Sequence, residues 1–360
     1  MIDFFIKVKQ QERQNLPFVI YSKPNKNALV GFFQKNDHLY FADDFTESGF
    51  VFSPFDGNQI ILIPKNQSQK WASQLSTSAE KQHSNFTVSE NHKDKEHFKN
   101  LVQKGIDSIR KGVLSKVVLS REEIIDLPGF DIVSIFEKLV RTYPTAFCYC
   151  WFHPKIGLWM GASPERLLKA QKNQFYTMAL AGTQTFEDDM EVIWGNKEKE
   201  EQQLVTDFIL TNLKDVTTEV NVSSPYTLKS GNLLHIKTDI EGIVNPDSNL
   251  KEIVSILHPT PAVCGLPKRV AKDFILQHEG YDRAYYTGFL GELNRKVEPK
   301  GKLKSDLYVN LRCMQIKIAP DNATTKVHLY MGCGITKDSI PENEWEESVN
   351  KSMTIKKIIG

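Results

Sequence analysis

The sequence predicts an α+β fold in which large antiparallel sheets are layered with helices. Three observations support this class. Aromatic and β-branched runs with strand character cluster toward both ends of the chain, amphipathic helical patterns lie between them, and strand–helix–strand spacings do not repeat as in a doubly wound fold. With 360 residues, of which 40% are hydrophobic and 25% charged, the chain has enough apolar material for one large domain.

The composition argues against several classes of partner. A formal net charge of +1 gives no field that would attract nucleic acid or an anionic membrane, so neither is expected as a partner. The sequence contains no run of about 18 apolar residues, so no membrane span is expected. Lysines interrupt the apolar residues at the start, where the apolar region of a secretory signal would lie. The five cysteines are an odd number without CxxC spacing, which favours reduced thiols in a cytoplasmic protein. We expect a monomer.

The first part of the chain is expected to consist of strands and turns. Aromatic or β-branched runs bounded by Pro, Asn, Asp and Gly predict strands at 18–21, 28–33, 38–41 and 59–63. The composition turns polar from 64 to 95, as in a surface connection. We therefore divide the chain into an amino-terminal β-rich part with its polar connection, 1–90, and a core, 91–360, within the same domain.

The core alternates helices and strands without a regular repeat. Helical periodicity predicts helices at 98–109 and 196–213, on both sides of 257–267, and from 341 onward. The first of these would end at Gly112, and a further helix is expected to begin after Asp131 as its N-cap. Strand patterns lie at 115–121, 147–152, 158–160, 174–180, 219–222, 233–240, 284–293, 307–318 and 327–331. Alternation at 115–121 places Lys116 and Val118 on one face and Val117 and Leu119 on the other.

The loop at 257–267 reads LHPTPAVCGLP and carries three prolines and one histidine, His258. Proline fixes φ and restricts the preceding residue, so this segment is neither helix interior nor central strand. A stiff apolar loop between two helices is a suitable wall for a ligand site, and equally a helix connector with a capping histidine.

Two acidic pairs have the spacing of one helical turn, Glu198 with Glu201 and Glu344 with Glu347. Carboxylates from two helices would suit Mg²⁺, which takes a few hard oxygen ligands and keeps some of its waters. The other interpretation is a solvated charged face, because the first pair lies in the charged run 197–201 and Glu347 can pair with Lys351.

Other polar residues lie in unusual positions. Lys116 stands mid-strand among apolar neighbours, either on an edge strand or partly desolvated in a cleft as a general base. Glu165 follows a proline turn and is either an exposed turn residue or an acid with a raised pKa. Arg312, expected on one strand face with Tyr308 and Asn310, could clamp a carboxylate or bond a loop. The segment 332–334, Gly-Cys-Gly, would offer backbone N–H groups to an anion at a strand end.

Six segments together resemble the chorismate-utilising enzymes, most closely the isochorismate synthases, in that family's order. They are KVVLSR at 116–121, SPER at 163–166, AGT at 181–183, EQQLVTD at 201–207, the proline loop, and GCGI at 332–335 followed by Glu347 and Lys351. The resemblance implies a single α+β domain with two large antiparallel sheets around a deep cleft, and chorismate as the small-molecule substrate.

The resemblance also implies roles for single residues. Glu201 and Glu347 would bind Mg²⁺, supported by Glu198 and Glu344. Lys116 would be the general base that activates water for attack at C2, and Glu165 the general acid for the C4 hydroxyl. The remaining implied substrate contacts are Gly182, Thr183, His258, Ala262, Val263, Tyr286, Arg312, Gly332, Cys333, Gly334 and Lys351.

The sequence also differs from the family pattern at several positions. Gln184-Thr185-Phe186 follows Thr183 where many relatives have Arg-Pro-Arg-Gly, which leaves contacts from that segment in doubt. Ala181 stands where aminodeoxychorismate synthases carry a nucleophilic lysine, which disfavours that branch. Two rivals to an isochorismate synthase are a salicylate synthase, which also eliminates pyruvate, and a non-catalytic chorismate-binding subunit partnered by an amidotransferase.

Overall fold

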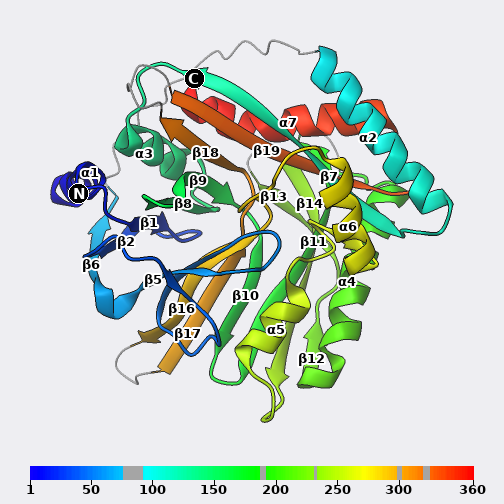
Figure 1. The fold of residues 1–360 in the computed structure, drawn as a ribbon. Coiled ribbons are helices and arrows are strands. Elements are labelled where there is room, and N and C mark those ends of the chain that lie inside the picture. Colours follow the sequence, from blue (N-terminus) through cyan, green and yellow to red (C-terminus); the bar gives the residue numbers. More distant parts are fainter. Residues whose placement is uncertain (76–91, 187–191, 231–232, 298–301, 319–324) are drawn as a thin grey trace.

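Two large antiparallel sheets form the centre of the molecule, as the α+β class and the family resemblance led us to expect (Figure 1). The computed structural model describes residues 1–75, 92–186, 192–230, 233–297, 302–318 and 325–360. Part of the polar segment 64–95, residues 76–91, lies outside the described residues.

The first sheet has nine strands. In spatial order they are β15 (Gly265–Leu266), β7 (Lys116–Leu127), β19 (Thr325–Ile335), β18 (Cys313–Ile318), β9 (Gly157–Ser163), β8 (Phe147–His153), β1 (Phe18–Ser22), β2 (Ala28–Gln34) and β6 (Ser68–Gln74). The ten-stranded sheet runs β12 (Thr217–Val222), β14 (Leu233–Val244), β11 (Gln174–Thr185), β10 (Arg166–Gln171), β17 (Lys302–Val309), β16 (Phe289–Val297), β4 (Gly49–Ser53), β5 (Ile61–Pro64) and β3 (Tyr40–Phe41), with β13 (Tyr226–Ser230) also paired to β14.

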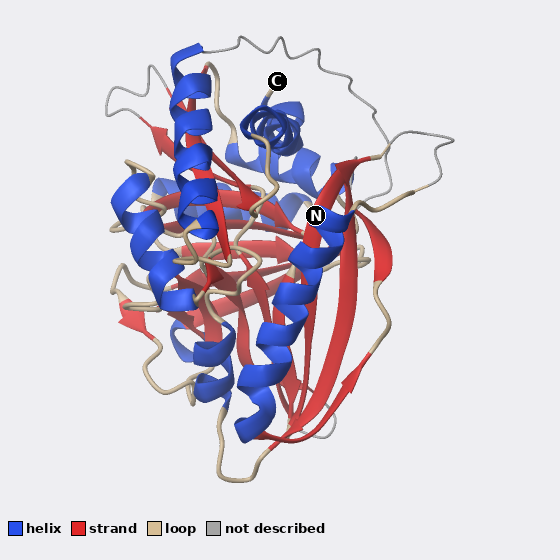
Figure 2. Ribbon diagram, turned by 90° about the vertical axis from the view of Figure 1, so that its right-hand side faces the viewer, coloured by secondary structure: helices blue, strands red, loops and turns tan. Residues whose placement is uncertain are grey.

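Helices cover the outer faces of both sheets (Figure 2). They are α1 (Ile2–Arg13), α2 (His92–Arg110), α3 (Ile132–Thr142), α4 (Asn196–Leu213), α5 (Leu250–Leu257), α6 (Lys268–His278) and α7 (Pro341–Ile359), with 3₁₀ turns at Lys65–Gln67 and Lys214–Val216. Apolar side chains of α1, α3 and the end of α7 pack on the nine-stranded sheet, and those of α4 and α5 on the ten-stranded sheet. An aromatic core that includes Tyr21, Phe52, Trp151 and Tyr308 fills the space between the sheets.

Local signals explain where several helices begin and end. The Asp131 carboxylate accepts a hydrogen bond from the Ser134 N–H at 2.8 Å, which caps α3 as predicted. Gly112 has a φ of +73° just after α2, the left-handed conformation that ends helices. Pro341 opens α7 at its first position, where a missing N–H costs nothing.

Some predicted elements were wrong or missing. Residues 1–63 were expected to lack helices, yet α1 buries Phe4, Phe5 and Val8 at helical spacing. Strands β4, β6, β10 and β13 were missed. The predicted strand 284–293 begins only at Phe289, because Ala284 and Thr287 have positive φ values in the turns before it.

The predicted strand 307–318 is in fact two strands in different sheets. Strand β17 ends at Val309 in the ten-stranded sheet, and β18 begins at Cys313 in the other. Between them Arg312 has a φ of +48°, so it does not share a strand face with Tyr308 and Asn310. Residues 310–312 therefore form a crossover that places Arg312 between the sheets.

Candidate active site

A cavity lies where the two sheets approach each other, beside α4, α7 and the proline loop. Its lining encloses about 630 Å³ of empty space, counting solvent at the mouth. It brings together eleven of the residues singled out in the sequence: Glu165, Gly182, Thr183, Glu201, Ala262, Val263, Tyr286, Arg312, Gly332, Gly334 and Lys351.

A second hollow adjoins this cavity and shares Thr183 with it. Glu198, Glu344 and Glu347 line this hollow. The residues predicted to serve as metal ligands are therefore divided, because Glu201 lines the cavity and the other three line its neighbour.

Lys116 is not among the residues that line the cavity, but it forms an ion pair with Glu201, which does line it. The distance between Lys116 Nζ and Glu201 Oε1 is 3.0 Å, and the lysine side chain is 0% exposed. Strand β7 is flanked by β15 and β19, which excludes the edge-strand interpretation of Lys116. Burial would raise the pKa of Glu201, but Lys116 and Lys197 outweigh it, so the pKa is lowered and the carboxylate is charged.

Glu165 is buried on the same cavity with a different protonation state. Burial raises the pKa of Glu165 from 4.5 to about 8, against the opposing effect of Lys116 and Lys351. Its backbone is fixed, because the Val309 N–H donates to Glu165 O at 3.0 Å and the Ser163 hydroxyl donates to Val309 O at 2.5 Å. The side chain at this position is therefore a proton donor at neutral pH.

Two cations face the cavity beside these groups. The Arg312 guanidinium donates to Thr354 Oγ1 at 3.2 Å and pairs with no carboxylate in the described part of the chain. Lys351 Nζ donates to Glu347 Oε1 at 2.6 Å and to Gly332 O at 2.8 Å. An anionic ligand would therefore meet a guanidinium with free donors and an ammonium positioned by α7.

Gly332 and Gly334 leave space for these groups inside β19, not after its end as expected. Both pair with β7, opposite Ser120 and Val118, while β18 pairs with β19 only as far as Leu329. Because Gly332 O bonds Lys351 and strand backbone groups alternate in direction, the N–H groups of Gly332 and Gly334 point away from β7. They face the side on which the cavity lies.

Cys333 and His258 are not among the residues that line this cavity, so their predicted contacts with a ligand stay predictions. The Cys333 thiol points to the opposite face of β19 and donates to Glu344 O at 3.2 Å. His258, in the proline loop, lies edge-on to Phe289 at 5.0 Å between ring centroids and lines a different hollow. Strand alternation accounts for the position of the Cys333 side chain, and the turn after α5 for that of His258.

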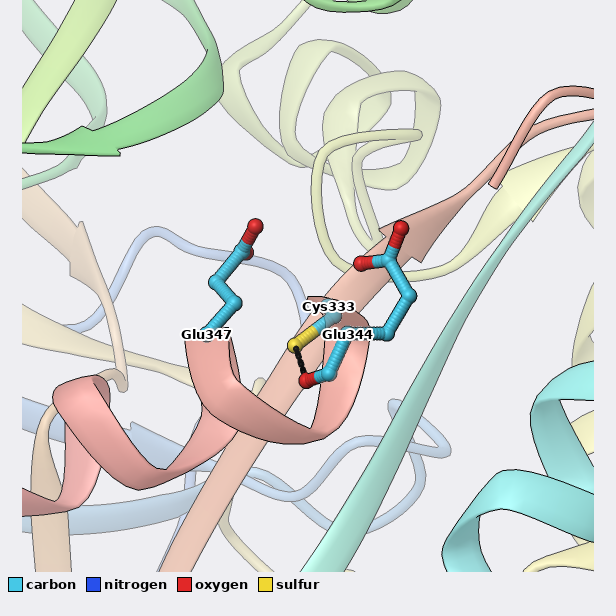
Figure 3. A group of neighbouring side chains, drawn as sticks. All are labelled: Cys333, Glu344 and Glu347. Atoms are coloured by element: carbon cyan, nitrogen blue, oxygen red, sulfur yellow. Dashed lines mark hydrogen bonds between the residues drawn. The ribbon is translucent and has the colours of Figure 1, made fainter. Parts of the chain in front are cut away.

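The second hollow, which is lined by Glu198, Glu344 and Glu347 and is called the acidic hollow below, has features that fit a divalent cation. Figure 3 shows the carboxylates of Glu344 and Glu347 projecting to the same side of α7. Ligand atoms of Cys333, Glu344 and Glu347 lie within 4.8 Å of one another. Glu344 Oε2 is buried without a hydrogen-bond partner, and burial together with Glu347 raises the pKa of Glu344 to about 7.

The donor set favours a hard ion held by the two carboxylates. A cation between them would relieve their repulsion and satisfy the orphaned oxygen. Burial raises the pKa of the Cys333 thiol well above its usual value, and Mg²⁺ prefers oxygen, so Cys333 is a poor ligand for it.

Lys197, which the sequence analysis did not select, contacts this acidic hollow. Its Nζ lies 2.5 Å from Glu344 Oε1. Burial would lower the pKa of Lys197, but Glu344, Glu347 and Glu201 outweigh it and raise the pKa. A single ammonium therefore offsets charge from all three carboxylates.

Three further residues were missed. His235 lines the cavity, with Nδ1 3.1 Å from Gly182 O, and burial and Arg312 lower its pKa to about 3. The buried pair Glu279 and Arg283 ties the walls together, since Arg283 donates to Val263 O at 2.9 Å and to Val118 O at 2.7 Å. A polar residue within an apolar run was the available signal for His235, and the i,i+4 spacing was the signal for Glu279 and Arg283.

Residues 56–360 match the family model described as chorismate binding enzyme, which covers most of the chain. The chain belongs to the chorismate binding enzyme family. It is 29% identical over 262 residues to isochorismate synthase EntC of Escherichia coli, covering 69% of this chain and 63% of that protein. It is also 29% identical over 268 residues to the salicylate biosynthesis isochorismate synthase of Pseudomonas aeruginosa, covering 72% of this chain and 54% of that protein.

The fold has solved counterparts over nearly its full length. The structure of MenF, the menaquinone-specific isochorismate synthase from Escherichia coli, superimposes with a TM-score of 0.77 at 22% identity, covering 96% of this chain and 89% of MenF. This likeness confirms the predicted fold. The aligned regions of EntC and the Pseudomonas aeruginosa protein are less than two thirds of those proteins.

Proposed function

We propose that this protein is an isochorismate synthase, an isomerase that converts chorismate to isochorismate with Mg²⁺ bound. One observation carries the proposal. An acid that holds its proton at neutral pH, Glu165, shares a cavity with Arg312 and Lys351 and with the carboxylate partner of Lys116. Pairing a proton donor with a base on opposite sides of one substrate is a common way to run acid and base chemistry at a single pH.

The substrate carboxylates would be bound by the cations of the cavity. The guanidinium of Arg312 and the ammonium of Lys351 offer charge-assisted hydrogen bonds, with the N–H groups of Gly332 and Gly334 beside them. Ala262, Val263 and Tyr286 would bound the ring, because they supply apolar surface to the lining of the cavity.

The reaction would exchange one hydroxyl for another without a net change in composition. Water forms a bond to C2 while Lys116 Nζ takes its proton, the ring double bonds shift, and the C4–O bond breaks. Glu165 donates its proton to the departing hydroxyl, which leaves as water. Each turnover ends with Lys116 protonated and Glu165 ionised, so a proton must return from one to the other.

Lys116 can take a proton only as the neutral amine. In the structure it is held in an ion pair with Glu201. The charge of Glu201 therefore has to be engaged elsewhere in the reacting state. Glu201 is also one of the carboxylates that we assign to the metal.

We assign Mg²⁺ to Glu347 and Glu201, supported by Glu344 and Glu198. The orphaned Glu344 oxygen and the clustered carboxylates support this assignment. When bound, the ion would supply positive charge that orients and neutralises a substrate carboxylate.

The test is product analysis after incubation of the purified protein with chorismate, with and without Mg²⁺. The expected result is isochorismate in equilibrium with chorismate, formed only with the metal and lost in Lys116→Ala. Salicylate and pyruvate would instead identify a salicylate synthase. No turnover with metal present, together with binding of chorismate, would identify a non-catalytic subunit. A monomeric state and a cytoplasmic location stay predictions.

The described helices include none that is both long and apolar enough to pass through a membrane.

A further inference from the structure

A separate hollow lies behind the proline loop, on the side away from the catalytic cavity. It is bounded by α5, the start of α6, the turn around Gly57, and Phe289, and it encloses about 990 Å³ of empty space, counting solvent at the mouth. None of its lining residues lines the catalytic cavity.

The hollow has an apolar floor. Its apolar lining residues are Phe45, Ile60, Val254, Pro259 and Phe289. The rings of Phe45 and Phe289 are 6.4 Å apart, and His258 meets Phe289 edge-on. Phe45, Val254 and Phe289 are at most 5% exposed, so a flat ligand would cover chiefly Ile60, the one of the five that is partly exposed.

Four cations surround this floor, namely Lys251, Lys268, Arg269 and Lys272. In the described part of the chain none of the four forms an ion pair with a carboxylate. Lys268 donates to backbone oxygens of Ser255 at 2.9 Å and Ile256 at 3.2 Å, and also to His258 O. Lys272 donates to the Asp56 backbone oxygen at 2.8 Å, so both lysines are held by backbone oxygens and not by an acid. Burial lowers the pKa of Lys268 to about 8.

Acidic groups nearby do not cancel this charge. Asp56 also lines the hollow, but its carboxylate accepts hydrogen bonds from Asn58, at 2.9 Å from the backbone N–H. Asp44 lies within electrostatic range of Lys251, yet its pKa is lowered chiefly by hydrogen bonds from Thr46. The lining therefore carries three more positive than negative charges, if Asp56 is counted as ionised.

The buried imidazole of His258 also lines the hollow. His258 is 8% exposed, and its Nε2 makes no hydrogen bond of good geometry, although the backbone of Pro54 and Phe55 interacts with the ring and acts to raise its pKa. Burial and the charges of Lys268 and Lys272 lower the pKa of His258 to about 3. An anion in the hollow would offset the charges that now act on this ring.

We propose that this hollow is a binding site for a small organic anion, with its apolar part toward Ile60 and its carboxylate or phosphate head among the four cations. The proposal goes beyond the proposed function and does not depend on it. Pro259 lines this site and Ala262 lines the catalytic cavity, so only two residues of one stiff loop, Thr260 and Pro261, separate them in the sequence.

The test is isothermal titration calorimetry with benzoate and phenyl phosphate, which share an anionic head on a ring, and with the neutral isostere benzamide. We expect at least one anion to bind the wild-type protein, with the stronger identifying the preferred head group, and benzamide not to bind. The double variant K251E/R269E, changed at two exposed positions, should weaken anion binding by about tenfold or more. K104E, an exposed lysine on α2, is the matched control and should bind as the wild type does.

Three results would overturn the proposal. One is no binding of either anion up to about 10 mM, a range in which weak specific sites are detected. Another is equal binding of benzamide. The third is anion binding that survives in K251E/R269E but is lost in Arg312→Gln, which would place the anion in the catalytic cavity.

Discussion

Gly334 and Glu201 are in direct contact, and a Cβ atom on Gly334 would lie 1.9 Å from Glu201 Oε1. The same oxygen holds Lys116 Nζ at 3.0 Å. The absence of a side chain at one position of β19 thus determines where a carboxylate of α4 sits, and with it the environment of the proposed general base.

Gly334→Ala should therefore displace Glu201 and break its ion pair with Lys116. We expect turnover of chorismate to fall by about 100-fold or more, since displacements near 1 Å can have effects of this size. Gly129→Ala is the control, because Gly129 has no atoms near its Cβ position, although its φ is positive, +71°, unlike that of Gly334. It should cost about 1 kcal/mol of stability and keep full activity. Unchanged turnover in Gly334→Ala would show that the position of Glu201 is unimportant.

Glu165→Gln should alter both activity and the pH dependence of stability. With a pKa of about 8 in the folded protein and about 4.5 unfolded, Glu165 binds a proton more tightly in the folded state. The wild type should therefore lose stability as the pH rises from about 4.5 to 8, by at most roughly 5 kcal/mol. Glutamine does not titrate, so the variant should match the wild type at pH 4 and exceed it at pH 9.

Urea denaturation at several pH values tests this difference, with Glu200→Gln as an exposed control on α4. Turnover in Glu165→Gln should fall by about 10²–10⁴-fold, the usual contribution of a general acid. In the wild type, turnover should decline above pH 8 as Glu165 ionises. A variant whose stability follows the wild-type pH curve would contradict the raised pKa.

Lys116→Met should destabilise the protein because it leaves Glu201 buried beside one cation fewer. Breaking a buried pair costs about 3–5 kcal/mol. In this variant the pKa of Glu201 should rise, since Lys116 is the main group that lowers it. The double variant Lys116→Met/Glu201→Gln should regain much of the stability but no turnover. Recovery of activity in the double variant would exclude Lys116 as the base.

Mg²⁺ should raise the melting temperature, because it binds the folded protein. At a concentration about 100 times Kd the stabilisation is about 2.7 kcal/mol. Glu344→Gln and Glu347→Gln should each reduce the shift, whereas Glu200→Gln, which changes charge by the same amount on the outer surface of α4, should not. This readout needs no substrate. An equal shift of the melting temperature in all variants would show that the metal does not bind at α7.

The sequence was sufficient for the elements with strong local signals. Asp131 as an N-cap, Gly112 after α2 and the helix 196–213 needed only local information, and they agree with the structure. The helix α1 was not predicted because its apolar residues Phe4, Phe5 and Val8 are few and interspersed with lysines. Its burial comes from the sheet beneath it, which local patterns do not report.

The candidate site was largely assembled from resemblance, because its residues are far apart in the chain. No local pattern indicates that Lys116 meets Glu201, or that the chain changes sheets at 310–312. His258 lines a different hollow, and a loop's composition does not reveal which of its faces meets a cavity. Burial, which raises the pKa of Glu165, is likewise a property of the assembled sheets.

The order in which a ribosome makes the chain gives the position of α7 a further meaning. Lys116 and Glu165 are synthesised long before Glu344, Glu347 and Lys351, which all lie on α7. A nascent chain can pair most of both sheets and still lack the acidic hollow and one cation of the cavity. The proposed active site is therefore completed only after the strands of both sheets have been synthesised.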